Sequence, residues 1–98
     1  MDISELQKHV WDFSRKHGFD QSSMETRTVY LMSEVGEMAK EILQLKFHPE
    51  QNEEIKERLG MEIYDVVWNL LELANKLEID LEKAFRQKME INKERVWT

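Results

Sequence analysis

The chain has 98 residues, enough for one domain with a modest hydrophobic core, and we expect residues 1–98 to form a single domain. Hydrophobic residues make up 41% and charged residues 35%, with three glycines and one proline, a composition that favours helices over a sheet. The formal net charge of −6 argues against a nucleic-acid surface, and the absence of cysteine excludes disulfides and thiolate metal sites.

The hydropathy of the chain indicates no membrane partner. No apolar run approaches the roughly 18 residues that a membrane span requires. The N-terminal residues Met1-Asp2-Ile3-Ser4 do not resemble a signal peptide. The expected location is therefore the cytoplasm.

The first half of the chain predicts two helices. A capping box from Asp2 to Glu5 precedes apolar residues at helical spacing, and Gly18 is a natural stop, which predicts a helix over residues 3–17. A second capping box, from Ser22 to Glu25, predicts the start of a helix over residues 24–46. The apolar stripe of this second helix would be Leu31, Val35, Met38, Ile42 and Leu45.

The second half predicts two more helices. Pro49 ends the preceding helix, because proline cannot continue it, and a third helix is expected over residues 52–77. Asp80 is a suitable N-cap for a fourth helix over residues 81–96. The expected stripe of the third helix is Ile55, Leu59, Ile63, Val66, Leu70, Ala74 and Leu77.

The third helix also has a second apolar flank. A helix that is apolar on a stripe and on a flank needs two partners, and in so short a chain the second partner is expected to be another copy of the chain. The sequence therefore predicts a homodimer or homotetramer. The flank consists of Met61, Tyr64, Trp68 and Leu71.

Two acidic couplets lie beside the apolar stripes. Glu34 and Glu37 are three residues apart on the second helix, and Glu62 and Asp65 have the same spacing on the third. This spacing places each pair on one helix face, and two such pairs on packed helices predict a four-carboxylate site for Mg²⁺, with Mn²⁺ as an alternative. A competing explanation is that E-x-x-E pairs occur by chance in any Glu-rich helix.

A polar row continues the apolar face of the fourth helix. Lys88, Asn92 and Arg95 follow at helical spacing, so they are candidates for contacts with phosphate groups of a substrate. Asn69, on the same flank as Glu62 and Asp65, is a further candidate for substrate binding. The alternative is that the two cations of the row are ordinary long side chains on a solvated C-terminal helix.

Four carboxylates near a cationic row suit metal-assisted hydrolysis of a phosphoanhydride. The metal would bridge phosphate oxygens and activate water, and the cations would hold the outer phosphates. A di-iron carboxylate bundle is the nearest competitor, but it requires Glu-x-x-His pairs. No histidine of this chain has a glutamate three residues before it.

Three segments also resemble a known family. Residues 33–39 (SEVGEMA), 62–67 (EIYDVV) and 88–95 (KMEINKER) are similar, in order and spacing, to the MazG-type all-α nucleoside triphosphate pyrophosphohydrolases, and the resemblance spans about residues 5–96. It implies an all-α, four-helix, antiparallel bundle-like fold that assembles as a homo-oligomer with sites at subunit contacts. It also implies hydrolysis of (deoxy)nucleoside triphosphates between the α and β phosphates, with Mg²⁺ on the four couplet acids.

Two hypotheses about function follow. The first is a (deoxy)nucleoside triphosphate pyrophosphohydrolase that yields a nucleoside monophosphate and pyrophosphate. The second is a helical self-association module of the same fold with little catalysis. The clustered acids favour the enzyme, because a scaffold gains nothing from keeping like charges together. His9, Trp11 and Phe19 are candidates for the wall of a base pocket, with core or surface positions as the alternative.

Overall fold

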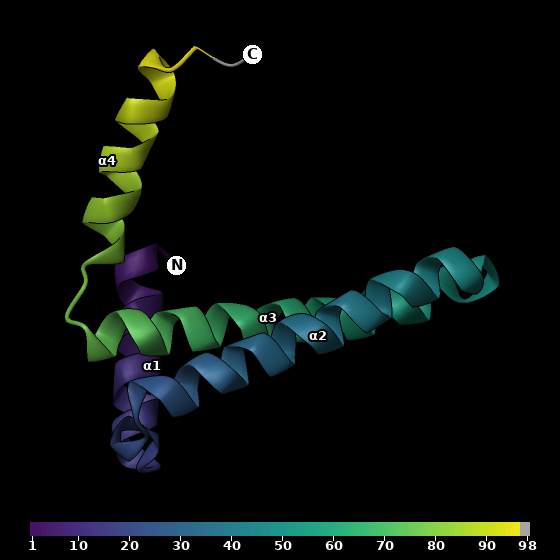
Figure 1. Cartoon of the computed structure of the whole chain (residues 1–98), viewed down its shortest axis with the longest axis horizontal. Helices are drawn as coiled ribbons and strands as arrows, with labels where there is room; N and C mark the ends of the chain where they lie inside the picture. The colour runs from purple at the N-terminus through teal and green to yellow at the C-terminus, as the bar shows by residue number, and fades with distance from the viewer. Residues whose placement is uncertain (97–98) are drawn as a thin grey trace.

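The computed structural model describes residues 1–96, and Trp97 and Thr98 of the expected domain lie outside the described residues (Figure 1). Within that range the chain is all-α and has no strand, as predicted. The helices are α1 (Ile3–Lys16), α2 (Met24–Phe47), α3 (Asn52–Lys76) and α4 (Leu81–Glu94), with short 3₁₀ turns η1 (Phe19–Gln21) and η2 (Pro49–Gln51). Each predicted helix is present, and its ends differ from the prediction by at most about two residues, the usual scatter of boundary assignment.

Side-chain caps explain where the helices begin. The Asp2 carboxylate accepts a hydrogen bond from the backbone N–H of Glu5 at 2.8 Å, as the capping box predicts. The cap of α2 is Ser23 rather than the predicted Ser22, because the Ser23 hydroxyl oxygen accepts from the backbone N–H of Thr26 at 3.1 Å. The predicted stop after α1 is also present, since Gly18 has φ of 75°, a left-handed conformation that glycine adopts without steric cost.

Helices α2 and α3 form a long antiparallel hairpin (Figure 1). Pro49 begins the η2 turn between them, so the chain reverses where the sequence predicted the break. Ile55, near this turn, is completely buried. Other residues of the predicted stripes are covered only in part: Ile42, Ile63 and Leu70 remain 46–49% exposed.

The other two helices do not close a bundle around this hairpin within one chain. Helix α1 packs across α3 near its C-terminal end, and α4 contacts α1 and extends away from the hairpin (Figure 1). The expected antiparallel bundle is therefore realised here only by the α2–α3 pair. Within residues 1–96, no helix has a segment long and apolar enough to cross a membrane.

The structure corrects the predicted second apolar flank of α3. Leu71 is buried within the chain, and the Trp68 ring meets the Phe13 ring of α1 edge-on, with 5.2 Å between the centroids. Met61 and Tyr64 remain 62% and 54% exposed. Helix α1 thus covers the C-terminal half of the flank, because it crosses α3 at that level.

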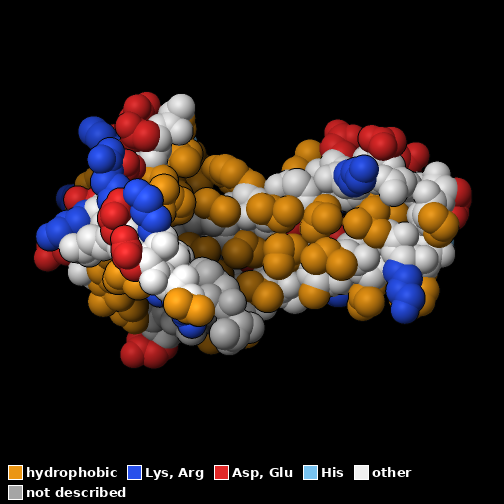
Figure 2. All heavy atoms as spheres, turned by 90° about the horizontal axis from the view of Figure 1, so that it is seen from above, with side chains coloured by type: hydrophobic (Ala, Val, Ile, Leu, Met, Phe, Trp, Pro, Cys, Tyr) orange, Lys and Arg blue, Asp and Glu red, His pale blue; other side chains and the backbone are white. Residues whose placement is uncertain are grey.

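The chain is extended for its length. Its radius of gyration is 16.2 Å, whereas a compact domain of this length would have about 13 Å. Its accessible surface is 7597 Å², against about 6,000 Å² for a compact monomer of the same mass. Hydrophobic side chains form a band along the hairpin on the face shown in Figure 2. The chain therefore exposes apolar surface that a compact monomer would bury.

The first prediction concerns the start of α4. The Asp80 carboxylate accepts from the backbone N–H of Lys83 at 3.1 Å, so Asp80→Ala should lower the free energy of unfolding by about 1 kcal/mol. Asp80→Asn should keep most of the stability, because asparagine caps equally well. Chemical denaturation followed by circular dichroism measures both. Glu90→Ala, an exposed acid on the same helix, is the control, and an equal loss there would contradict the capping role.

Candidate active site

Three of the four predicted metal ligands come together across the hairpin. Glu34 lies midway along α2, and Glu62 and Asp65 lie midway along α3, so antiparallel packing brings the two couplets side by side. One carboxylate oxygen from each of these three residues lies within 4.8 Å of the others. All three residues are half-buried. The three residues therefore form a half-buried acidic group between α2 and α3.

The other acids on the same flank of α2 behave differently. Glu37 is exposed and lies outside the group of three, although its negative charge still acts on Glu62. Glu41, one turn further along, pairs with Arg58 of α3, whose Nε lies 3.3 and 3.2 Å from the two carboxylate oxygens. The structure thus pairs Glu41 with Arg58 and leaves it outside the group of three acids.

Crowding of like charges perturbs Glu62. Partial burial raises the pKa of its carboxyl group above the ordinary value of 4.5, and the negative charges of Glu34 and Asp65 and a hydrogen bond with Glu34 act in the same direction. The more distant charge of Glu37 adds to the effect. A divalent cation would relieve this repulsion, because it attracts every carboxylate in the group.

The donor set fits a hard divalent cation. The three residues offer only carboxylate oxygens, which suit Mg²⁺ or Mn²⁺ better than the softer metals that prefer thiolates or imidazoles. Three protein ligands also leave coordination positions for water and phosphate oxygens, the usual arrangement for Mg²⁺ in phosphoryl chemistry. Glu34, Glu62 and Asp65 are therefore the residues that could hold the metal.

An aromatic pocket adjoins the acidic group. Its volume is about 290 Å³, and Asp65 belongs both to its wall and to the acidic group. Within its lining, the Trp68 ring lies in edge contact with the rings of His9 and Phe13. The complete lining is His9, Phe13, Phe19, Tyr64, Asp65 and Trp68. Flat rings next to carboxylates can accommodate a planar heterocycle beside metal-bound phosphates.

The three predicted candidates for the wall of a base pocket lie in two different pockets. His9 and Phe19 line the aromatic pocket, whereas Trp11 lines a different one. Tyr64 and Trp68 also line the aromatic pocket, although the sequence predicted for them an oligomer contact and no role in the candidate active site. The signal that could have found them is their spacing, since Tyr64 directly precedes Asp65 and Trp68 follows one turn later.

A buried polar network, which the sequence pattern did not predict, supports the wall of the aromatic pocket. The Arg27 side chain donates from Nε to the Ser22 hydroxyl at 2.7 Å and from a terminal nitrogen to the Phe19 carbonyl at 3.2 Å. Arg27 is only 8% exposed, and its Nε lies 3.9 Å from the carboxylate of the buried Glu72. Arg27 therefore fixes the backbone that carries Phe19.

The predicted substrate contacts lie in two places relative to the acids, one on α3 beside them and three on or just after α4. Asn69 is buried, and its amide nitrogen donates to the Asp65 carbonyl at 2.9 Å. Lys88, Asn92 and Arg95 lie on or just after α4, which extends away from the middle of the hairpin (Figure 1). A role for these four residues in substrate binding stays a prediction.

The second prediction uses the raised pKa of Glu62. The folded chain binds this proton more tightly than the unfolded chain, so the stability linked to it is present below pH 4.5 and is lost as pH rises through the raised value. In EDTA, Glu62→Gln should therefore have a higher melting temperature than the natural chain at neutral pH, and the difference should shrink as pH falls. Thermal denaturation across pH measures this. Glu57→Gln, an exposed acid on α3, is the control, and an identical gain there would refute the cause given.

Comparison with known proteins assigns the chain to a family. The family model of the MazG nucleotide pyrophosphohydrolase domain matches residues 22–97, which include both acidic couplets and α4. No curated protein and no solved structure matches the chain in the corresponding searches. Because the match covers most of the sequence, the chain belongs to the MazG nucleotide pyrophosphohydrolase domain family.

Proposed function

We propose that the protein is a Mg²⁺-dependent pyrophosphohydrolase of nucleoside or deoxynucleoside triphosphates, with Mn²⁺ able to replace Mg²⁺. The products would be a nucleoside monophosphate and pyrophosphate, formed by hydrolysis between the α and β phosphates. The observation that carries the proposal is that Asp65 belongs to both the three-carboxylate group and the aromatic pocket. This places a metal-binding group directly beside a surface suited to a nucleobase.

The acidic residues have distinct roles in this proposal. Glu34, Glu62 and Asp65 hold the metal, which when bound neutralises phosphate charge and lowers the pKa of a coordinated water. Glu37 lies one turn from Glu34 on α2, so a rotation of its side chain would bring it to the group as the fourth predicted ligand. The packing of α2 on α3 would keep these half-buried carboxylates in place before substrate arrives, which would reduce reorganisation during the reaction.

The aromatic pocket would hold the base. Trp68 and Phe13 meet edge to face, and the Phe19 ring lies 6.2 Å from the Phe13 ring, so the wall is largely aromatic. Stacking of a base on such rings contributes about 1–3 kcal/mol in nucleic-acid complexes. Asp65 at the edge of the pocket then sets the distance between base and metal. Asn69 supports this residue through its hydrogen bond to the Asp65 carbonyl.

A second copy of the chain would supply the cations. The triphosphate carries more negative charge than one metal ion neutralises, and α4, which contains Lys88 and ends just before Arg95, extends away from the hairpin that carries the acids (Figure 1). The excess of exposed surface over a compact monomer is about 1,600 Å², roughly twice the area that one partner buries in a standard protein interface. We therefore propose a homodimer or homotetramer in which α4 of one subunit serves the acidic group of another.

The third prediction tests the metal ligands. Glu62→Gln and Asp65→Asn should each lower Mg²⁺-dependent pyrophosphate release by about 100-fold or more, because each removes a charged ligand worth several kcal/mol in the transition state. Activity is measured on the standard ribo- and deoxyribonucleoside triphosphates with Mg²⁺ or Mn²⁺. Glu41→Gln, an acid paired with Arg58, is the matched control and should retain activity.

The outcome of that experiment separates the two functional hypotheses. If the natural chain releases no pyrophosphate from any of these substrates, the enzyme assignment is wrong and the self-association module becomes the better description. Full activity in both α3 variants would contradict the proposed ligands even if the natural chain is active.

The fourth prediction tests the shared site. Lys88→Ala should lower kcat or raise KM by tenfold or more, about 1.4 kcal/mol. When Lys88→Ala and Glu62→Gln chains are co-refolded in equal amounts, half of the dimers are mixed and each mixed dimer has one intact site. Activity should then return to about one quarter of the natural level.

Sedimentation checks that the mixed sample is oligomeric. A mixture no more active than the average of its two parents would show that α4 does not act across a subunit contact.

A further inference from the structure

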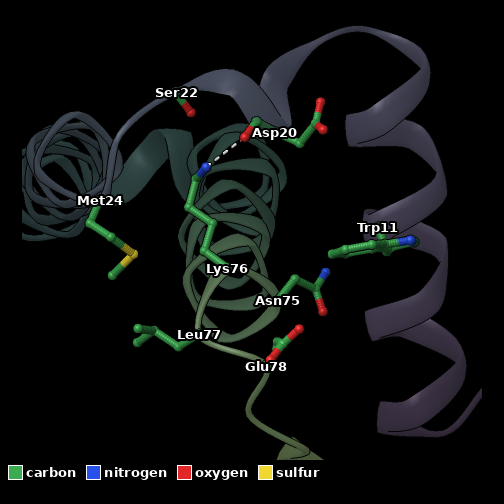
Figure 3. A pocket seen from close by; sticks show the side chains of 8 residues that line it. All are labelled: Trp11, Asp20, Ser22, Met24, Asn75, Lys76, Leu77 and Glu78. Carbon is green, nitrogen blue, oxygen red and sulfur yellow. Dashed lines mark hydrogen bonds between the residues drawn. The ribbon is translucent and has the colours of Figure 1, made fainter.

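A second pocket lies on the side of α1 opposite the aromatic pocket. An outer cavity of about 400 Å³ is bounded by α1, the η1 turn, the start of α2 and the end of α3 (Figure 3). A deeper cavity of about 20 Å³ adjoins it and adds Ser14 and Glu72 to the lining. Neither cavity shares a residue with the acidic group or with the aromatic pocket. The outer lining is Trp11, Asp20, Ser22, Met24, Asn75, Lys76, Leu77 and Glu78.

The inner cavity contains an acceptor that no described protein group satisfies. Glu72 is 3% exposed, and its Oε2 atom accepts from the Ser14 hydroxyl at 3.1 Å. The nearest cation, Arg27, lies 3.9 Å from the same oxygen, and its hydrogen bonds go to Ser22 and Phe19. The other oxygen, Oε1, is buried without a hydrogen-bond partner among residues 1–96. A buried carboxylate oxygen in this state favours a ligand that donates a hydrogen bond.

The charge around the two cavities favours a cation. The linings contain three carboxylates, Asp20, Glu72 and Glu78, and one ammonium group, Lys76. The Arg27 guanidinium beside Glu72 adds a second positive charge, so the balance is still negative by one charge. The Lys76 Nζ already donates to the Asp20 carbonyl at 2.8 Å, as Figure 3 shows. A phosphate or carboxylate ligand would therefore meet net negative charge here, and the pocket is unsuited to the triphosphate of the proposed substrate.

The shape and acceptors of the inner cavity select a primary ammonium group. A volume of about 20 Å³ accommodates one group of the size of a water molecule. Asn75 donates from its amide nitrogen to the Gln7 carbonyl at 3.1 Å, and its carbonyl oxygen points toward Glu78 (Figure 3), so the acceptor that the inner cavity offers is Oε1 of Glu72. An ammonium group offers three donors and no acceptor, whereas Mg²⁺ or Ca²⁺ would need several waters to complete its coordination, and a cavity of this volume has no room for them.

The outer cavity provides a surface for a hydrocarbon tail. The Trp11 indole forms one wall from α1, and the Met24 and Leu77 side chains contribute the opposite side (Figure 3). Glu78 stands at the end of α3 with φ of 55°, at the rim. We propose that this double pocket binds a small organic cation whose primary ammonium group donates to Oε1 of Glu72 while its hydrocarbon part lies against Trp11 and Leu77.

The test uses n-butylammonium as the probe and n-butanol as the uncharged control of equal length. On ¹⁵N-labelled protein with Mg²⁺ present, n-butylammonium should shift the indole N–H of Trp11 and the backbone amides of Asn75 and Lys76 saturably, with millimolar affinity as expected for so small a ligand. The amides of Glu34 and Asp65 should not move. The alcohol should bind at least tenfold more weakly, because it carries no charge.

Variants locate the binding group. Glu72→Gln should weaken n-butylammonium binding tenfold or more, whereas Glu78→Gln, the same change at the exposed rim, should weaken it less than about threefold because solvent screens exposed charges. If Glu72→Gln fails to fold, the comparison of amine and alcohol on the natural chain decides the proposal. Equal binding of amine and alcohol, shifts confined to the acidic group, or no saturable shift would overturn it and assign the inner cavity to a water molecule.

Discussion

The antiparallel packing of α2 on α3 is the constraint on which the candidate site depends. Each helix alone carries two acids one turn apart, an arrangement that mildly destabilises a helix. Only their packing brings Glu34 within reach of Glu62 and Asp65 and creates the crowding that raises the pKa of Glu62. The apolar contacts of the hairpin must offset this repulsion, and a divalent cation bound at the proposed site would relieve it.

The position of α1 divides the rest of the surface. His9 and Phe13 contribute to the aromatic pocket beside Asp65, and Trp11 and Ser14 contribute to the double pocket on the other side. One crossing helix therefore separates a pocket suited to a base from one suited to a cation. The same crossing covers Trp68 and Leu71, which removes half of the apolar flank from any contact with another chain.

The open arrangement of the chain has a functional consequence. Ile42, Ile63 and Leu70 belong to the apolar stripes, yet they stay roughly half exposed in a single chain. A fold that leaves such residues exposed and directs α4 outward is suited to assembly, since burial of apolar surface is the main driving force for association. In this arrangement the acids and the cations of one functional site would come from different copies, which couples assembly to activity.

Local features of the sequence determined the elements of this protein. The caps at Asp2 and Asp80, the left-handed Gly18 and the break at Pro49 depend only on neighbouring residues, so the helix ends that they set could be predicted from the sequence. The acidic couplets were equally readable, because a three-residue spacing fixes two side chains on one helix face whatever the tertiary structure. The predicted all-α class and the choice of Glu34, Glu37, Glu62 and Asp65 as candidate ligands required nothing further, and the structure brings three of these four acids together.

Only the tertiary structure decided how these elements meet. The exposure of Glu37, the pairing of Glu41 with Arg58 and the outward direction of α4 depend on packing angles and rotamers that local patterns do not encode. The buried contact between Ser14 and Glu72 joins residues 58 positions apart, and Glu72 looks like any other helical glutamate in the sequence. Burial converts such a residue from a solvated charge into a structural or binding group, and burial is a property of the folded chain alone.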